Sequence, residues 1–165
     1  MPSYLVRPTN RILAGPSGAQ EQIIEMKVGA AATVAEMVAG RLVIYDAAAG
    51  SVKETGALAD NVLGVIEVRS GKLLTDTHAV ASPVSVIPRH SGAWVVLTLI
   101  KAGAAVLPGD PLVSGLLGKA QKQAAGAMGG QGTVIAHALE AVDPTASDLP
   151  CLCALSSSAE PAAAT

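Results

Sequence analysis

The feature that most constrains this chain is the near absence of aromatic side chains from a strongly apolar sequence. Half of the 165 residues are hydrophobic, yet there is no Phe, and Tyr4, Tyr45 and Trp94 are the only aromatics. A core must therefore be built from Val, Leu, Ile and Ala, and branched aliphatic side chains pack well on the pleated surface of a sheet. The length suits one domain or two very small ones. The composition thus favours β-structure.

The apolar residues occur in short runs that are interrupted by Gly, Pro, Asp and Asn. Several short strands separated by such turn residues indicate a sandwich or barrel. We therefore predict an all-β or mainly β fold, a small β-barrel or β-tulip-like domain. The expected strands are 22–28, 41–45, 62–68, 84–88, 93–100, 133–142 and 151–155, with weaker candidates at 51–53 and 119–122.

Evidence for helices is limited to one segment. The stretch Ala30–Ala39 is the best candidate, with Gly40 as a possible stop. A second Ala- and Gln-rich stretch, Ala120–Met128, contains Gly126 and is expected to be a loop or a single helical turn.

The two ends of the chain differ in composition from its middle. Residues 1–21 include Pro2, Pro8 and Pro16 without sustained periodicity, which is typical of an extended arm. Residues 156–165 are of low complexity and are expected to form a tail. We accordingly expect an N-terminal arm (1–21), a barrel-like domain (22–155) and a C-terminal tail (156–165).

A similar phrase occurs twice within the expected domain. In the first copy, Gly40 precedes a strand, Gly50 precedes a short strand ending at Lys53, and a long strand ends near Glu67. In the second copy, the corresponding points are Gly109, Gly118, Lys122 and Glu140. Each phrase describes a strand–hairpin–strand unit with one apolar face, so we expect two units that close against each other. A chance alignment of Gly turns in any β-protein is the alternative.

Charge and hydropathy argue against two classes of partner. Charged residues make up 15% of the chain, the net charge is −2, and Lys and Arg are scattered singly. There is no basic stripe to neutralise phosphates and no aromatic set to stack bases, so nucleic-acid binding is not expected. The longest apolar run, Ala93–Ile100, is far shorter than the roughly 20 residues of a membrane-spanning helix, and we expect no membrane association. The N-terminus has no apolar block long enough for a secretory signal. A surface with so few charges is suited to being covered by a protein partner.

The residues that most often carry chemistry have no convincing partners in the sequence. His78, His90 and His137 stand apart, and the spacings that are diagnostic of metal sites are absent. The glycine cluster 126–132 leads into a strand pattern and not a helix N-terminus, so it indicates a hairpin loop and not a phosphate site. Cys151 and Cys153 are expected to be small buried hydrophobic residues. We predict no catalytic, metal or cofactor-binding residues.

Four stretches resemble the head decoration, or capsid cement, proteins of tailed bacteriophages and related archaeal viruses. These are Gly40–Asp46, the Asp60–Val68 stretch that contains NVLGVIEV, PGDPLVSG at Pro108–Gly115, and GTVIAHALEA at Gly132–Ala141. The similarity spans roughly residues 40 to 142 and consists of Gly and aliphatic patterns. His137 stands where Gly is commoner in that group.

The resemblance implies a non-enzymatic virion protein on the outer surface of an icosahedral capsid, commonly a homotrimer. Its partner would be the major capsid protein, with no nucleic acid, membrane or small-molecule substrate. The N-terminal arm would clamp neighbouring subunits, and strand addition would be a natural mode of contact. The apolar and cationic contacts of such an arm would be Tyr4, Leu5, Val6, Arg7, Ile12 and Leu13.

Two other functions remain open from the sequence. One is a small-ligand or carbohydrate-binding module on a virion or cell surface, with Trp94 as the platform for a sugar ring. The other is a hydrolase or autoprocessing barrel that uses Ser91 or Ser114 with His90 or His137.

Overall fold

The fold is all-β, as the composition predicts. The computed structural model describes residues 23–48, 50–56, 61–67, 75–101, 103–124 and 133–156. The strands of the first half are β1 (Ile24–Val28), β2 (Leu42–Tyr45), β3 (Ser51–Glu54), β4 (Gly64–Ile66) and β5 (Pro83–Pro88). Those of the second half are β6 (Trp94–Leu99), β7 (Pro111–Ser114), β8 (Ala120–Lys122), β9 (Ala136–Ala138) and β10 (Leu149–Leu155). Two short 3₁₀ turns, η3 (Val34–Glu36) and η4 (Leu116–Gly118), complete the described elements.

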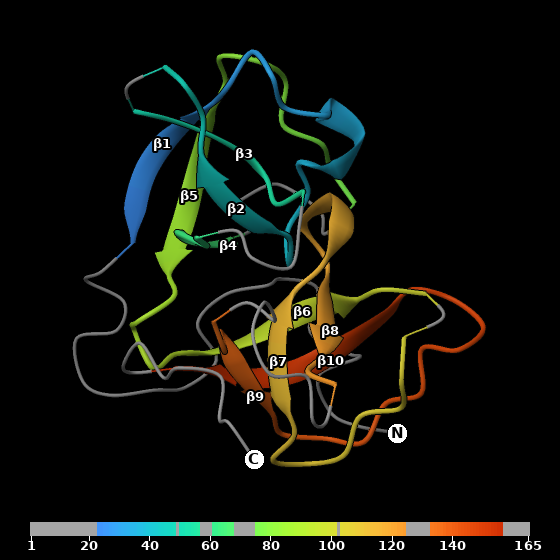
Figure 1. The fold of residues 1–165 in the computed structure, drawn as a ribbon. Coiled ribbons are helices and arrows are strands. Elements are labelled where there is room, and N and C mark those ends of the chain that lie inside the picture. Colours follow the sequence, from blue (N-terminus) through green and yellow to red (C-terminus); the bar gives the residue numbers. More distant parts are fainter. Residues whose placement is uncertain are drawn as a thin grey trace.

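The strands form two closed barrels of five strands each, one above the other in Figure 1. The first follows the order β1-β3-β2-β4-β5, and the second follows β6-β8-β7-β9-β10. In the first barrel β1 runs parallel to β3 and antiparallel to β5. In the second, β6 runs parallel to β8 and antiparallel to β10. The remaining neighbours are antiparallel in both, so the two barrels share one topology.

The correspondence between the barrels extends to individual hydrogen bonds. Gly40 N–H donates to Ile66 O at 3.0 Å in the first barrel, and Gly109 N–H donates to Ala138 O at 2.8 Å in the second. Three further bonds of the first barrel each have an equivalent in the second. Thr55 N–H donates to Leu42 O, as Gln123 N–H donates to Pro111 O. Gly29 N–H donates to Val52 O, as Ile100 N–H donates to Ala120 O, and Arg89 N–H donates to Leu63 O, as Ser156 N–H donates to Ile135 O. The predicted repeat is therefore a structural repeat.

The glycines that the repeat aligned have the same backbone conformation. Gly40 and Gly109 have φ of 81° and 91°, and Gly50 and Gly118 have φ of 73° and 69°. These are left-handed values that glycine adopts without steric cost, so each pair of glycines marks the same turn. The alignment slips at its ends: the strand register matches Lys53 with Gln121 and not with Lys122.

Matched residues also fill the two barrel interiors. The core cluster of the first barrel consists of Met26, Val28, Met37, Val43, Val52, Ile66, Val84 and Val86. The strand register and the matched turns identify the equivalent residues of the second barrel. In the same order these are Leu97, Leu99, Val106, Leu112, Ala120, Ala138, Cys151 and Cys153, and all of them are buried in the second core. Each repeat therefore encloses its own core, because β1 and β5, or β6 and β10, join the strand–hairpin–strand unit. The expectation that the two units close directly against each other is therefore wrong: each forms a barrel of its own, and the two share apolar packing only where the barrels stack.

The predicted helix at Ala30–Ala39 is wrong, because only the turn η3 forms there. Carboxylates from the β2–β3 hairpin bind the backbone at the start of this segment. Asp46 Oδ2 accepts from Ala31 N–H at 3.3 Å, and Glu54 Oε2 accepts from Thr33 N–H at 3.0 Å. The winding ends at Met37, whose backbone has φ −82° and ψ 66°, outside the helical region, and whose carbonyl accepts from the backbone N–H of His78 at 2.9 Å.

The long strand expected at 133–142 is also shorter than predicted. Only β9 (Ala136–Ala138) is a strand, and a bend at Leu139–Glu140 separates it from an isolated bridge between Val142 and Val106. Conversely, β7 (Pro111–Ser114) is not among the individually expected strands, and only the repeat phrase indicated a strand after Gly109. Pro111 is accommodated because Ala138 N–H donates to the preceding carbonyl of Asp110.

The barrels stack with the tip of one hairpin on the base of another. We call residues 115–118, between β7 and β8, the second tip, and the open end of the β2–β3 hairpin (Val38, Gly40–Leu42, Glu54 and Thr55) the first base. Gly118 N–H donates to Thr55 O at 3.0 Å, and Thr55 Oγ1 donates to Gly115 O at 3.0 Å. In Figure 1 the β7–β8 turn reaches upward into the first barrel. Leu42, Val65 and Ile87 of the first barrel therefore belong to the second barrel's core cluster.

Within the described residues, no helix has the length and hydropathy of a membrane span.

Candidate functional site between the barrels

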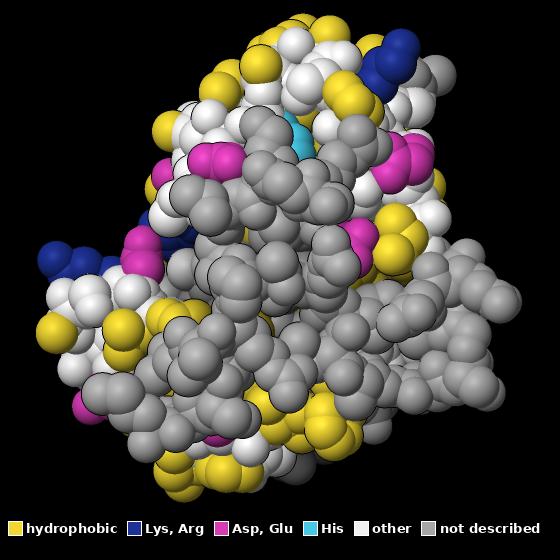
Figure 2. Space-filling model, turned by 180° about the vertical axis from the view of Figure 1, so that it is seen from behind, with side chains coloured by type: hydrophobic (Ala, Val, Ile, Leu, Met, Phe, Trp, Pro, Cys, Tyr) yellow, Lys and Arg dark blue, Asp and Glu magenta, His cyan; other side chains and the backbone are white. Residues whose placement is uncertain are grey.

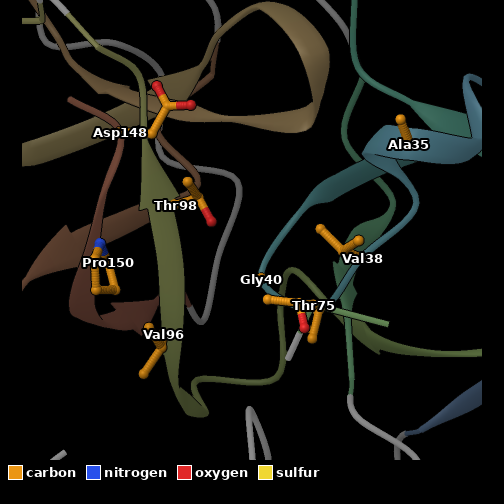
Figure 3. A pocket seen from close by; sticks show the side chains of 9 residues that line it. Ala35, Val38, Gly40, Thr75, Val96, Thr98, Asp148 and Pro150 are labelled. Atoms are coloured by element: carbon orange, nitrogen blue, oxygen red, sulfur yellow. The ribbon is translucent and has the colours of Figure 1, made fainter. Parts of the chain in front are cut away.

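A cavity of about 400 Å³ lies between the two barrels. The first barrel contributes the segment after η3, with Ala35 and Val38–Gly40, together with Thr75. The second contributes Val96 and Thr98 from β6, Pro150 from β10, and Asp148. Figure 3 shows the two groups of side chains on opposite sides of the gap. The volume falls in the range of small-ligand sites.

The polar edge of the cavity is formed by Asp148. Its Oδ1 accepts from Lys101 N–H at 2.6 Å, and its Oδ2 is paired with Lys119 Nζ at 2.8 Å. Partial burial acts to raise the pKa of Asp148, but these hydrogen bonds and the positive charges of Lys119 and Arg41 outweigh it, so the pKa lies below its ordinary value. Asp148 is therefore a carboxylate that is already engaged by two donors. The rest of the lining is mainly aliphatic, which suits an apolar group.

The sequence indicated none of these cavity residues. They come from separate stretches, around residues 35–40, 75, 96–98 and 148–150, and only the stacking of the barrels brings them together. Asp148 next to Leu149 and Pro150 gives no signal beyond an ordinary turn.

The arm residues Tyr4, Leu5, Val6, Arg7, Ile12 and Leu13 lie outside the described residues, as do the whole glycine cluster 126–132 and residues 157–165 of the tail.

The three histidines occupy separate parts of the fold. His78 is buried beside the first barrel, where its backbone N–H donates to Met37 O at 2.9 Å. His90 is exposed in the turn after β5, where its Nε2 accepts from Arg89 Nε at 2.8 Å. Partial burial and the charge of Arg89 lower the pKa of His90. His137 is half-buried on β9, opposite Ala154 and Pro111.

The serines of the hydrolase alternative lie in buried positions on strands and turns. His137 pairs with Pro111 on β7, and Ser114 lies three residues further along the same strand. Ser114 is therefore about 10 Å from Pro111 and points to the opposite face of the sheet. Ser91 Oγ accepts from Ala93 N–H at 3.2 Å inside the turn that also holds His90. The register thus separates Ser114 from His137.

Cys151 and Cys153 are free and fully buried in the second barrel. They occupy the positions of Val84 and Val86 in the first barrel, so the prediction that they are small buried hydrophobic residues is confirmed. Burial raises the pKa of the Cys153 thiol well above its ordinary value, with Cys151 adding to the effect.

Among the residues that the structure describes, no three His, Cys, Asp or Glu side chains gather in a way that could hold a metal ion.

Large apolar side chains are exposed at the turns and strand ends of both barrels. Figure 2 shows hydrophobic side chains at the upper end of the first barrel and at the foot of the second. The most exposed are Tyr45 and Leu107, each at 60%. The others are Leu116, Val80, Leu117, Trp94, Val34, Ile24 and Leu139. Trp94 begins β6 and does not line the cavity.

Comparison of the chain with protein-family models and with curated protein sequences gives no match.

Proposed function

We propose that this protein is a structural virion protein that decorates the outside of an icosahedral capsid and stabilises the shell by clamping neighbouring major capsid proteins. The observation that carries the proposal is where the resembling stretches lie. They cover β2, β4, β7 and β9 with their turns, which are the repeated framework of the two barrels. The resemblance therefore concerns the residues that specify the fold, and not isolated loops.

The surface of the described part of the molecule supports a role in protein contact. Exposed Leu and aromatic side chains are distributed over turns at both ends, where they are available to a flat protein surface. Both barrels are closed, so their strands are already paired with each other. An arm that acts by strand addition would accordingly extend a sheet of the capsid protein.

The test is co-sedimentation with capsids of the encoding virus that were assembled without this protein. Full-length protein should sediment with the shells, whereas a variant lacking residues 1–18 should remain in the supernatant and keep the far-UV circular dichroism of the full chain. Many weak attachments act together on a shell, so single arm substitutions such as Leu5→Asp and Ile12→Asp should each weaken binding. A matched exposed substitution outside the arm, Thr145→Asp, is the control and should bind as the full chain does.

The outcomes separate the two parts of the proposal. Full binding by the truncated variant would overturn the clamping role of the arm. Failure of the full-length chain to bind any such shell would overturn the decoration role itself.

A second candidate function, a small-ligand-binding module, is favoured by the cavity between the barrels. A ligand that binds the folded state raises the temperature of unfolding, and the stabilisation grows with the logarithm of the ligand concentration once this exceeds Kd. A compound set screened by thermal unfolding should then contain ligands whose effect is lost in Val38→Trp, which fills the cavity. Carbohydrate binding through Trp94 would be lost in Trp94→Ala and retained in Val38→Trp.

A further inference from the structure

We propose that a second copy of this chain docks on the foot of the second barrel through its own β2–β3 turn, repeating between molecules the contact that joins the two barrels within one. We call residues 46–48 and 50 the first tip. We call the open end of the β7–β8 hairpin (Leu107, Gly109–Pro111, Lys122 and Gln123) the second base. The proposal does not depend on capsid binding.

The contact to be repeated is tightly packed inside the molecule. A Cβ on Gly118 would lie 3.1 Å from both Leu42 O and Arg41 Cβ and 3.3 Å from Glu54 Cβ. Thr55 is fully buried beneath the second tip and both donates to it and accepts from it. Val38 completes the first base from the side of the cavity.

The same pair of surfaces is present a second time, and within the part of the chain that the structure describes nothing is seated on it. The first tip corresponds to the second at its closing hydrogen bond: Asp46 N–H donates to Ser51 O, as Gly115 N–H donates to Lys119 O. The first turn is one residue longer, with residues 47–50 where the second has 116–118. Gly50 has the conformation of Gly118, but a Cβ there would meet nothing within 4 Å. One turn is therefore filled and its twin is open.

The second base likewise matches the first residue by residue. Asp110 N–H donates to Leu107 O as Arg41 N–H donates to Val38 O, so Leu107 corresponds to Val38. Leu107 is 60% exposed, whereas Val38 lines the cavity between the barrels. Gln123 takes the place of Thr55, and its side-chain amide can supply the donor that the Thr55 hydroxyl supplies to the second tip.

The chemistry of the two open surfaces is compatible. The exposed part of the first tip carries Ala47 and Ala48, which are small and allow close approach. Lys27, exposed on β1, corresponds to Thr98, whose N–H donates to Gly40 O at the first base. In a docked copy the Lys27 ammonium would therefore lie close to Asp110, which holds the place of Arg41 and whose Oδ2 is already bound by Lys122 Nζ and Leu107 N–H, each at 2.7 Å. Lys27 would thus join an existing ion pair through the remaining carboxylate oxygen.

A tip-to-base contact is heterologous, because the two molecules use different surfaces. Every copy that docks leaves one free tip and one free base, so copies add until they form a closed ring or an extended chain. This gives a test that an ordinary two-fold dimer would fail.

The experiment uses two full-length variants, Ala48→Arg, which blocks the first tip, and Leu107→Arg, which blocks the second base. Sedimentation velocity of the wild type should show a mass that rises with concentration above the 16.4 kDa of one chain. Each variant alone should remain a single chain. An equimolar mixture should give dimers that do not grow further, because one intact tip meets one intact base.

The control is Ala146→Arg, an exposed position two residues from Asp148 at the cavity, away from both open ends. It should associate as the wild type does. Circular dichroism establishes that each variant is folded, and Ala48→Glu and Leu107→Glu replace any that is not. A wild type that stays a single chain at millimolar concentration, or a mixture that forms no dimer, would overturn the proposal.

Discussion

At the scale of single residues, the structural repeat explains side chains that have no explanation in isolation. Cys151 and Cys153 are free, buried thiols that fill the positions that Val84 and Val86 fill in the other barrel. The sequence predicts their burial from the alternation of β10, because residues two apart share one face. It does not predict the exchange with valine, since β5 and β10 lie outside the repeated phrase.

This equivalence predicts that Cys153→Val is tolerated. Substitution by a residue of similar size and polarity should change the free energy of unfolding by less than about 1.5 kcal/mol in urea titrations. Cys153→Asp should abolish folding or cost several kcal/mol, because an unpaired carboxylate would enter the core. In the native wild type both thiols should resist an aromatic disulfide reagent that modifies them in urea. Rapid modification of the native protein would contradict the burial described here.

Asp148 gives the molecule a specific dependence on acid. Its pKa is lowered in the folded state from an ordinary value of 3.8, so folding favours the carboxylate. The stabilisation is fully present above the unfolded pKa and is lost as the pH falls through the folded pKa. Asp148→Asn should therefore reduce stability at pH 7 and flatten its decline below about pH 4, as measured by thermal unfolding from pH 7 to pH 2.5. An unchanged acid profile in the variant would contradict this assignment. Asp143→Asn, an exposed neighbour, is the control.

At the scale of elements, turns were more predictable than strands. The positions Gly40, Gly50, Gly109 and Gly118 were evident from the repeat because left-handed turns select glycine. The helix expected at Ala30–Ala39 failed because alanine-rich composition measures only local propensity, while the carbonyl of Met37 is bound by the backbone N–H of His78, which is distant in sequence. Strand pairing was not predictable either, since β1 pairs directly and in parallel with β3, although β2 lies between them in the sequence.

The two hairpin turns provide a matched measurement of the contact between the barrels. Gly50→Ala and Gly118→Ala introduce the same left-handed alanine, which costs about 1 kcal/mol. Gly118→Ala additionally forces its Cβ against Leu42 O and Arg41 Cβ, so we expect it to cost about 2–4 kcal/mol in total. Urea unfolding at low protein concentration, where copies are separate, gives both values. Equal losses for the two variants would show that the second tip is not packed against the first base.

At the scale of the whole molecule, the stacking of the barrels determines both the shared core and the cavity. The sequence indicated two related units but not how one is placed on the other. That placement depends on Leu42, Val65 and Ile87, which point out of the first barrel and are buried in the second barrel's cluster. Their counterparts Pro111, His137 and Ala154 are half-buried. Strand patterns alone do not distinguish an outward face that contacts another barrel from one that contacts solvent.

The shared core predicts that the two barrels unfold as one unit. Ile87→Ala, a change in the first barrel, should lower stability by about 2–4 kcal/mol. Fluorescence of Trp94, the one tryptophan, reports on the second barrel and should shift by the same amount as far-UV circular dichroism. Ile24→Ala, at a partly exposed position, should shift both signals much less. A Trp94 transition that does not respond to Ile87→Ala would mean that the second barrel folds independently.

The shared topology also creates a hazard during folding. β1 pairs with β5 in the first barrel in the same register in which β6 pairs with β10 in the second. During folding β1 could therefore pair with β10, and β6 with β5. Such an exchange between repeats is a characteristic misfolding route of duplicated chains. The side chains oppose it: Met26 faces Val84 in one barrel, and Leu97 faces Cys151 in the other, so an exchanged barrel would hold pairs of the wrong combined volume. Divergence of the two halves thus keeps each strand with its own barrel as the chain folds.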